Sequence, residues 1–105
     1  MKIINNKDEF DNLTETGAVV IQFSATWCNP CKVLSKTMEG VVPQHSDVEF
    51  YKIDIDNIDR SLLNEYNIRS VPKLLVFVNG HDVGEMIGAK SSEEITEFIN
   101  THKGS

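Results

Sequence analysis

Apolar residues follow two patterns along the chain, one typical of β-strands and the other of amphipathic helices. Short runs rich in apolar and β-branched residues predict five strands, at residues 2–5, 18–24, 48–55, 73–78 and 82–88. The run at 18–24 is almost continuously apolar at its start, which is typical of a central strand covered on both faces. Asn79-Gly80, between the last two runs, is a strong signal for a two-residue hairpin turn. The pattern therefore indicates a sheet with buried central strands and a closing hairpin.

Between the strands, apolar residues recur three or four positions apart, which predicts helices. Two of these helices have clear start signals, namely Asn6 as an N-cap and the pair Ser91 and Glu94 as a capping box. Residues 59–68 predict a short helix, and we expect Pro43 to end or kink the helix that precedes it. The apolar stripe of that preceding helix is formed by Leu34, Met38, Val41 and Val42.

The resulting element order over residues 1–105 is βαβαβαββα, with no internal repeat, linker or low-complexity tract. Strand–helix–strand units favour parallel neighbours with right-handed crossovers, and the final hairpin adds an antiparallel edge. We therefore expect a single α/β domain, with a central mixed sheet flanked by helices on both faces.

The charge balance narrows the classes of function. The chain has 105 residues, of which 40% are hydrophobic, and a formal net charge of −6. A nucleic-acid-binding protein needs a basic stripe and an anionic membrane surface needs clustered cations, whereas the Lys and Arg residues here are scattered. No apolar run is long enough to span a bilayer, and residues 1–10 lack the apolar segment of a signal peptide. We expect a cytoplasmic protein without nucleic-acid or membrane partners.

The only two cysteines, Cys28 and Cys31, lie between the strand at 18–24 and the helix that follows it. A helix N-terminus presents unpaired N–H groups and a partial positive charge, and both stabilise a thiolate. Pro30 suits an early helical position, because its missing N–H costs nothing there. Three residues of separation on a helical turn bring the two sulfurs within bridging range. We expect Cys28 to be an exposed nucleophile and Cys31, one turn deeper, to be the resolving thiol.

Three other interpretations of the cysteine pair compete with this one. Zinc needs about four ligands, but there is no second cysteine pair, and His45, His81 and His102 lie far away in sequence. Two inert core cysteines would leave the neighbouring Trp27 and Pro30 unexplained. A structural disulfide that closes so small a loop would constrain the unfolded chain little. Closely spaced cysteines in a reducing compartment more often carry redox chemistry, so we favour a redox couple and expect no metal.

Three segments resemble the thioredoxin family, in the family's order: FSATWCNPCK (23–32), SVPKLLVFVNG (70–80) and GEMIGA (84–89). The resemblance covers nearly the whole chain and implies a thioredoxin fold, with Cys28 as the attacking and Cys31 as the resolving cysteine. It also implies that Pro72 is a cis-proline facing the disulfide, and that the backbone of Val71 pairs with an extended substrate segment. The remaining matches are Trp27 as a shield and substrate surface, Gly88 and Ala89 as a further patch of the substrate groove, and Lys52 as a buried lysine beneath the site.

Each matching residue also has a plainer interpretation. Trp27 could be a half-buried core aromatic, Gly88 only a bulge or turn glycine, and Lys52 a solvated lysine at a strand end. An X-Pro bond is usually trans, so the cis assignment of Val71-Pro72 rests on the resemblance alone.

The chain departs from the family pattern close to the cysteines. Asn29 stands where most members have Gly, and we expect a less reducing potential if it stabilises the Cys28 thiolate. Gln22 replaces a buried aspartate that is thought to help deprotonate the resolving cysteine, and an amide has no titratable proton for that role. Three further departures are Ser24 for a common tryptophan, Lys36 for a helix-kinking proline, and Lys73, either a positive charge near the cysteines or a solvated lysine, for a threonine.

The hypothesis from the sequence is a thioredoxin-type protein disulfide oxidoreductase that works through a mixed disulfide. The resemblance implies a monomer that acts on disulfide-containing proteins and is recycled by a thioredoxin reductase using NADPH. No bound cofactor is expected apart from the redox-active Cys28–Cys31 disulfide, since no Gly-rich dinucleotide motif is present. Two alternatives stay open: a binding module or partner subunit whose thiols are incidental, and a more oxidising, substrate-dedicated variant.

Overall fold

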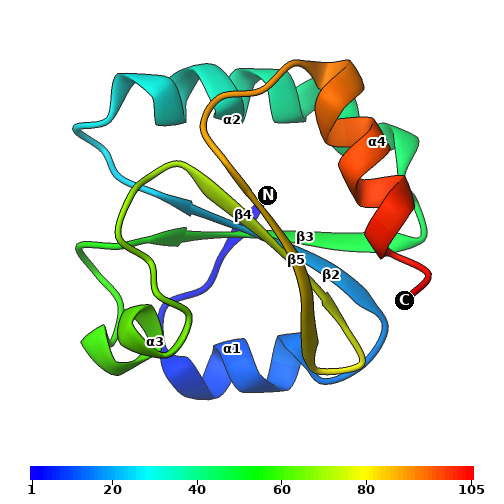
Figure 1. Cartoon of the computed structure of the whole chain (residues 1–105). Helices are drawn as coiled ribbons and strands as arrows, with labels where there is room; N and C mark the ends of the chain where they lie inside the picture. The colour runs from blue at the N-terminus through cyan, green and yellow to red at the C-terminus, as the bar shows by residue number, and fades with distance from the viewer.

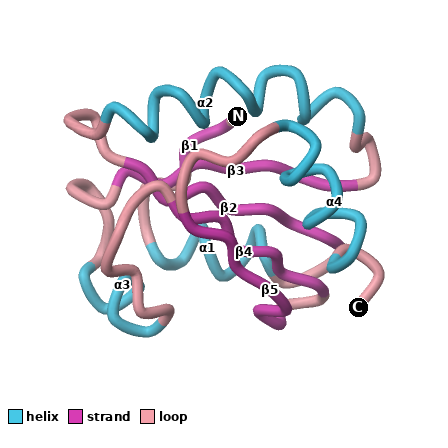
Figure 2. The backbone as a smooth tube through the Cα atoms, turned by 45° about the horizontal axis from the view of Figure 1, so that its top comes forward, coloured by secondary structure: helices cyan, strands magenta, loops and turns pink.

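Five strands form one mixed sheet in the order β1-β3-β2-β4-β5 in the computed structural model, which describes all residues from 1 to 105. Helices α2 and α4 cover one face of the sheet, and α1 and α3 cover the other (Figure 1). A view from a second direction shows the same three layers (Figure 2). The fold expected from the sequence, helices on both faces of a mixed sheet, is confirmed. The strands are β1 (Lys2–Ile3), β2 (Ala18–Ser24), β3 (Val48–Asp54), β4 (Lys73–Val78) and β5 (His81–Ile87).

The helices begin where the sequence places their caps. The Asn6 side chain accepts a hydrogen bond from the Glu9 N–H at 2.8 Å. Ser91 accepts one from the Glu94 N–H at 3.1 Å, while the Glu94 carboxylate accepts one from the Ser91 N–H at 3.2 Å. Both predicted caps are therefore confirmed. The helices are α1 (Lys7–Thr14), α2 (Asn29–Val41), α3 (Arg60–Glu65) and α4 (Ser92–His102), with a 3₁₀ turn, η1 (Val42–Gln44), after α2.

Several boundaries differ from the sequence prediction. Strand β1 has two residues instead of four, and α3 is shorter than the predicted 59–68. Val42 packs against the same core cluster as the rest of the predicted stripe, but it starts η1, in which Pro43 occupies an early position. A proline is tolerated there because the first N–H groups of a helical turn need no partner within it. Helix α2 thus ends at Val41, just before Pro43, as predicted, and the chain continues into a tighter turn.

The direction of β4 determines where the site lies. Strands β1 and β2 run parallel to β3, whereas β4 is antiparallel to β2 and β5 is antiparallel to β4. The parallel β4 expected from the strand–helix–strand pattern is wrong, because the short α3 does not carry the chain back along the sheet. Strand β4 therefore starts at the end of the sheet where β2 and β3 finish. In the resulting register Phe23 pairs with Lys73. The segment after β2 and the segment before β4 therefore meet at one end of the sheet, where β2 finishes and β4 begins.

Strand β2 is buried on both faces, as predicted. Val20 belongs to the apolar cluster under α2 and α4, whereas Val19 and Ile21 belong to the cluster over α1 and α3. Because side chains alternate along a strand, Gln22 shares the α2 face with Val20. A polar side chain is thus placed in the core directly below the helix that carries the cysteines.

Candidate active site

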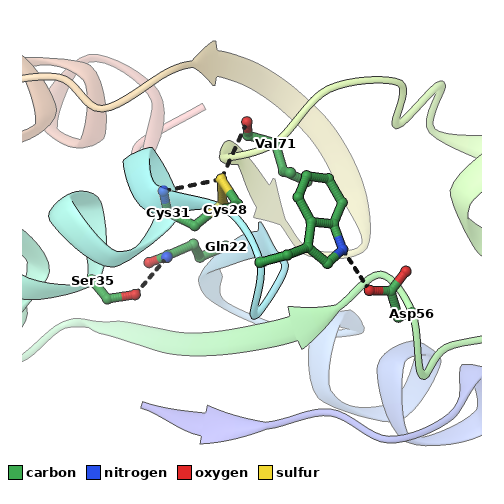
Figure 3. Close-up of a disulfide and its surroundings, with 7 residues drawn as sticks. Gln22, Cys28, Cys31, Ser35, Asp56 and Val71 are labelled. Carbon is green, nitrogen blue, oxygen red and sulfur yellow. Dashed lines mark hydrogen bonds between the residues drawn. A yellow bond between two sulfur atoms is a disulfide. The ribbon is translucent and has the colours of Figure 1, made fainter.

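Cys28 is the N-cap of α2, and its sulfur accepts a hydrogen bond from the Cys31 N–H at 3.1 Å (Figure 3). Cys28 and Cys31 form a disulfide, with their Cα atoms 5.2 Å apart. Pro30 lies in the first turn of α2, as predicted. The helix begins here because the β2 strand ends at Ser24 and Pro30 needs no donor partner at that position. The expected sulfur pair at a helix N-terminus is therefore present.

Both cysteines are buried in this oxidised form. Cys28 is 5% exposed and Cys31 is 1% exposed. The expectation of an exposed Cys28 is thus wrong here, although Cys31 is the deeper residue, as predicted. The reason is packing, because Ala25 joins the two cysteines in a small apolar cluster, with Ile55 and Val71 against it.

The loop before β4 lies against Cys28. The Val71-Pro72 peptide bond is cis, so the assignment made from the family resemblance is confirmed. The Val71 carbonyl oxygen lies 3.8 Å from the Cys28 sulfur, which has no proton to donate while it is in a disulfide (Figure 3). Neither the N–H nor the C=O of Val71 takes part in a backbone hydrogen bond. Both groups are free to pair with another extended segment.

Gly88, Ala89 and Trp27, which the family resemblance assigns to a substrate groove, lie at the same end of the sheet. The Gly88 N–H donates to the Pro72 carbonyl at 2.9 Å, and Gly88 has a φ of 96°, a conformation that favours glycine. Ala89, next to it, is exposed. Trp27 is 66% exposed, so the interpretation as a half-buried core aromatic is wrong.

The orientation of Trp27 depends on a residue that sequence reasoning missed. The Trp27 indole N–H donates to the Asp56 carboxylate at 2.8 Å (Figure 3). Asp56 lies in the loop after β3, and nothing in its local sequence marks it as a partner of a tryptophan on another loop. The bond holds an exposed aromatic ring beside the disulfide.

Gln22 lies fully buried beneath the cysteines. Its side-chain N–H donates to the Ser35 hydroxyl at 3.0 Å, and its carbonyl oxygen has no partner in the chain. Sequence reasoning also missed Ser35, although its position four residues after Cys31 places both on one face of α2. Lys52 pairs in register with Gln22 and is half-buried. With Cys31 and Ser35, Lys52 lines a cavity of about 420 Å³.

The other departures from the family pattern fall into two groups. Lys73 is neither solvated nor free, since its ammonium lies 3.2 Å from the Glu85 carboxylate and donates to the Asn67 carbonyl at 3.4 Å. Ser24 is buried at the end of β2. Asn29 and Lys36 are exposed, and neither side chain makes a hydrogen bond within the chain.

No group of three His, Cys, Asp or Glu side chains is placed where it could hold a metal ion. No helix is long and apolar enough to cross a membrane.

A dithiol–disulfide pair at a helix N-terminus, facing an unpaired backbone segment, is the site of a thiol–disulfide oxidoreductase. Comparison with known proteins agrees with this class. The thioredoxin family model matches residues 1–101. The thioredoxin of Mycoplasmoides gallisepticum is 38% identical over 100 residues, which are 94% of this chain and 99% of that protein. The thioredoxin of Chlamydia pneumoniae is 33% identical over 102 residues, 97% of this chain and 98% of that protein.

Solved structures show the same likeness. The thioredoxin of Malassezia sympodialis superposes with a TM-score of 0.88 at 32% identity, covering 97% of this chain and 92% of that one. A thioredoxin of Plasmodium falciparum gives a TM-score of 0.89 at 28% identity, covering 96% of this chain and 98% of that one. The chain belongs to the thioredoxin family. It is a thioredoxin-type protein disulfide oxidoreductase whose redox-active pair is Cys28 and Cys31.

Proposed function

We propose that the two cysteines have different roles, with Cys28 attacking the substrate and Cys31 completing the reaction. The Cys28 thiolate attacks a target disulfide, one target sulfur leaves as a thiolate, and a mixed disulfide forms. The Cys31 sulfur then loses its proton and attacks Cys28, so the second target sulfur leaves and the Cys28–Cys31 disulfide forms. The observation that carries this order is the N-cap position of Cys28, whose sulfur accepts the Cys31 N–H and lies nearer the surface.

Substrate binds, in this proposal, along the edge formed by Trp27, Val71, Pro72, Gly88 and Ala89. The unpaired peptide groups of Val71 support this, because an extended segment can complete their hydrogen bonds by strand addition. Trp27 offers exposed aromatic surface beside the disulfide. A target segment held there would have its sulfur next to Cys28, since the Val71 carbonyl is 3.8 Å from that sulfur.

The family supports a proposal for the physiological setting. We infer a monomeric, cytoplasmic single-domain protein that is returned to its dithiol form by a thioredoxin reductase using NADPH. Family membership and the absence of any Gly-rich dinucleotide motif in this chain support a separate reductase.

Reduction of insulin disulfides by dithiothreitol tests the activity and the roles together. Wild type should accelerate the reaction and Cys28→Ser should not. Cys31→Ser should instead accumulate a stable mixed disulfide, visible by mass spectrometry. If wild type and Cys28→Ser are indistinguishable, the protein is a binding module with incidental thiols. Repeating the assay with a thioredoxin reductase and NADPH separates a general thioredoxin from a substrate-dedicated one.

A further inference from the structure

Ser35 shares a cavity with the resolving cysteine. It lies one helical turn after Cys31 on α2, and both residues line the cavity of about 420 Å³ between α2 and the edge of the sheet. Four residues separate Ser35 from Cys31, so the two side chains lie on the same face of α2. Most of the residues that line it are polar or charged, although most of its lining surface is apolar, and a space of this size has room for water.

The hydroxyl proton of Ser35 has no partner within the chain. The Gln22 amide donates to the Ser35 oxygen at 3.0 Å, so this oxygen acts as an acceptor in that contact. Other hydroxyls on helices donate to the carbonyl four residues earlier, as Thr14, Thr37 and Thr101 do. Ser35 makes no such bond. Its proton is therefore available to a group in the cavity.

The resolving step creates a negative charge in this place. Cys31 must lose a proton before its sulfur can attack the mixed disulfide, and it is almost fully buried. None of the charged side chains that line the cavity makes a hydrogen bond with Cys31. Both oxygens of Asp54 already accept hydrogen bonds, from the Asp56 N–H at 3.0 Å and the Asn57 amide at 2.9 Å. The other charged residues that line the cavity are Lys32, Lys36 and Glu39 from α2 and Lys52 from β3.

We propose that Ser35 is a positioning residue for the resolving step, held by Gln22 so that its O–H donates to the Cys31 sulfur as the thiolate forms. The proton of Cys31 leaves to water in the cavity, and the hydrogen bond from Ser35, direct or through one water molecule, stabilises the charge left on sulfur. The Cys31–Cys28 bond then forms, the bond from Cys28 to the target breaks, and the target thiolate leaves. An amide–hydroxyl pair thus replaces a titratable acid in this chain. This inference rests on the order of attack proposed above.

The two steps can be followed separately with dithiobis(nitrobenzoate), a coloured aromatic disulfide. Attack by Cys28 of the reduced protein releases one nitrothiobenzoate, and attack by Cys31 on the mixed disulfide releases the second. In Ser35→Ala we expect an unchanged first phase and a second phase slower by about tenfold, as for the loss of one hydrogen bond to a charged group. The pH at which the second phase is half-maximal should also rise. Ser35→Thr, which keeps the hydroxyl, should restore both.

The matched control is Thr37→Ala, which removes a hydroxyl from the same helix that donates to the Val33 carbonyl instead. It should leave both phases unchanged. Gln22→Met should slow the second phase less than Ser35→Ala, and adding it to Ser35→Ala should cause no further slowing. Equal second-phase rates and pH profiles in wild type and Ser35→Ala would overturn the proposal. So would equal slowing of both phases, which would indicate a general disturbance of the site. Loss of the first phase in Cys28→Ser tests the order of attack independently.

Discussion

At the scale of single residues, the most consequential side chain is a buried amide. Gln22 is fully enclosed, donates one hydrogen bond to Ser35 and leaves its own carbonyl oxygen unpartnered. A buried polar atom without a partner costs free energy, but much less than a buried, unpaired charge. The amide therefore gives this chain a polar group under Cys31 at a moderate cost in stability.

A carboxylate at the same position should be more costly. Near neutral pH, Gln22→Asp should lower the free energy of unfolding by about 1–3 kcal/mol more than Gln22→Asn, which shortens the side chain without adding charge. Burial raises the pKa of the introduced carboxyl in the folded state above its unfolded value near 3.9. The excess cost is therefore complete above the folded pKa and disappears as the pH falls below about 3.9. Urea unfolding at several pH values measures this. A wild type that is no more stable than Gln22→Asp near neutral pH would contradict the prediction.

We expect Asn29 to affect the redox potential of the cysteine pair and not the stability of the fold. It is the first residue of α2, it is exposed, and its side chain makes no hydrogen bond in the disulfide form. If its amide donates to the Cys28 thiolate after reduction, it favours the dithiol state. Wild type should then be less reducing than Asn29→Gly, by on the order of 10–30 mV. Equilibration with glutathione redox buffers measures both midpoints, and coincident midpoints would rule out a role for this side chain.

At the scale of elements, β5 and α4 pack closely because residue 84 of β5 is a glycine, which has no side chain. The His102 ring packs on Phe98 at 4.8 Å between ring centres, and its Nδ1 atom lies 2.8 Å from the Phe98 carbonyl oxygen. A Cβ atom on Gly84 would lie 2.6 Å from Nε2 of His102. Gly84 does not have a positive φ, so space and not backbone conformation demands glycine here.

Gly84→Ala should therefore destabilise the protein by about 1–3 kcal/mol through overpacking. The cost should fall in a His102→Ala background, where the clash is absent.

Gly40→Ala is the opposite case, because nothing lies within 4 Å of its Cβ position, inside α2. It should stabilise the protein by roughly 0.5–1 kcal/mol through helix propensity. Thermal and urea unfolding of the four variants compares these values, and an undiminished cost in the double variant would exclude the clash with His102.

The sequence predicts most reliably those features that local chemistry decides. Caps at Asn6 and Ser91 and the turn at Asn79-Gly80 depend on neighbours within four residues, and all three are present. The direction of β4 depends on the end of the sheet at which the chain re-enters after α3, and no local signal carries that information. The same limit applies to Lys73, which is buried and pairs with Glu85 across a hairpin.

The site divides in the same way. The cysteine pair and the Val71-Pro72 segment were identified from motifs, and the structure brings them together. Asp56 and Ser35 were missed because their partners, Trp27 and Gln22, are 29 and 13 residues away. Such pairs form only after the sheet is assembled, so spacing along the chain does not reveal them.

At the scale of the whole molecule, a buried histidine couples stability to pH. His45 follows η1, and neither of its ring nitrogens has a hydrogen-bond partner in the chain. Burial is the main cause that lowers the pKa of His45, the Lys103 charge lowers it further, and Asp47 opposes this. Asp47 and Lys103 form an ion pair at 3.0 Å beside it. The folded state therefore keeps this ring neutral where the unfolded chain would take up a proton.

Stability should consequently fall as the pH is lowered below the unfolded histidine value near 6.5, because the unfolded state then binds more protons. Between about pH 7 and pH 5 the free energy of unfolding should decline in wild type and stay flatter in His45→Phe. Asp47→Asn should steepen the decline, because the Asp47 charge raises the pKa of His45 and its loss lowers that pKa further. It should also change the profile at lower pH, since the pair with Lys103 lowers the pKa of the Asp47 carboxyl. Parallel wild-type and His45→Phe profiles between about pH 7 and pH 5 would show that this histidine has no such effect.

The hydrogen bond between Trp27 and Asp56 also makes Trp27 an intrinsic fluorescent probe of the site. Trp27 is the only tryptophan, so selective excitation of indole reports on a single place. Its indole N–H donates to the Asp56 carboxylate at 2.8 Å, and Trp27 directly precedes Cys28 in the chain. Opening of the disulfide should change the surroundings of this one fluorophore, as should a substrate segment bound on the ring in the way proposed above. Emission intensity and wavelength can therefore follow reduction and substrate binding in real time, without any attached dye.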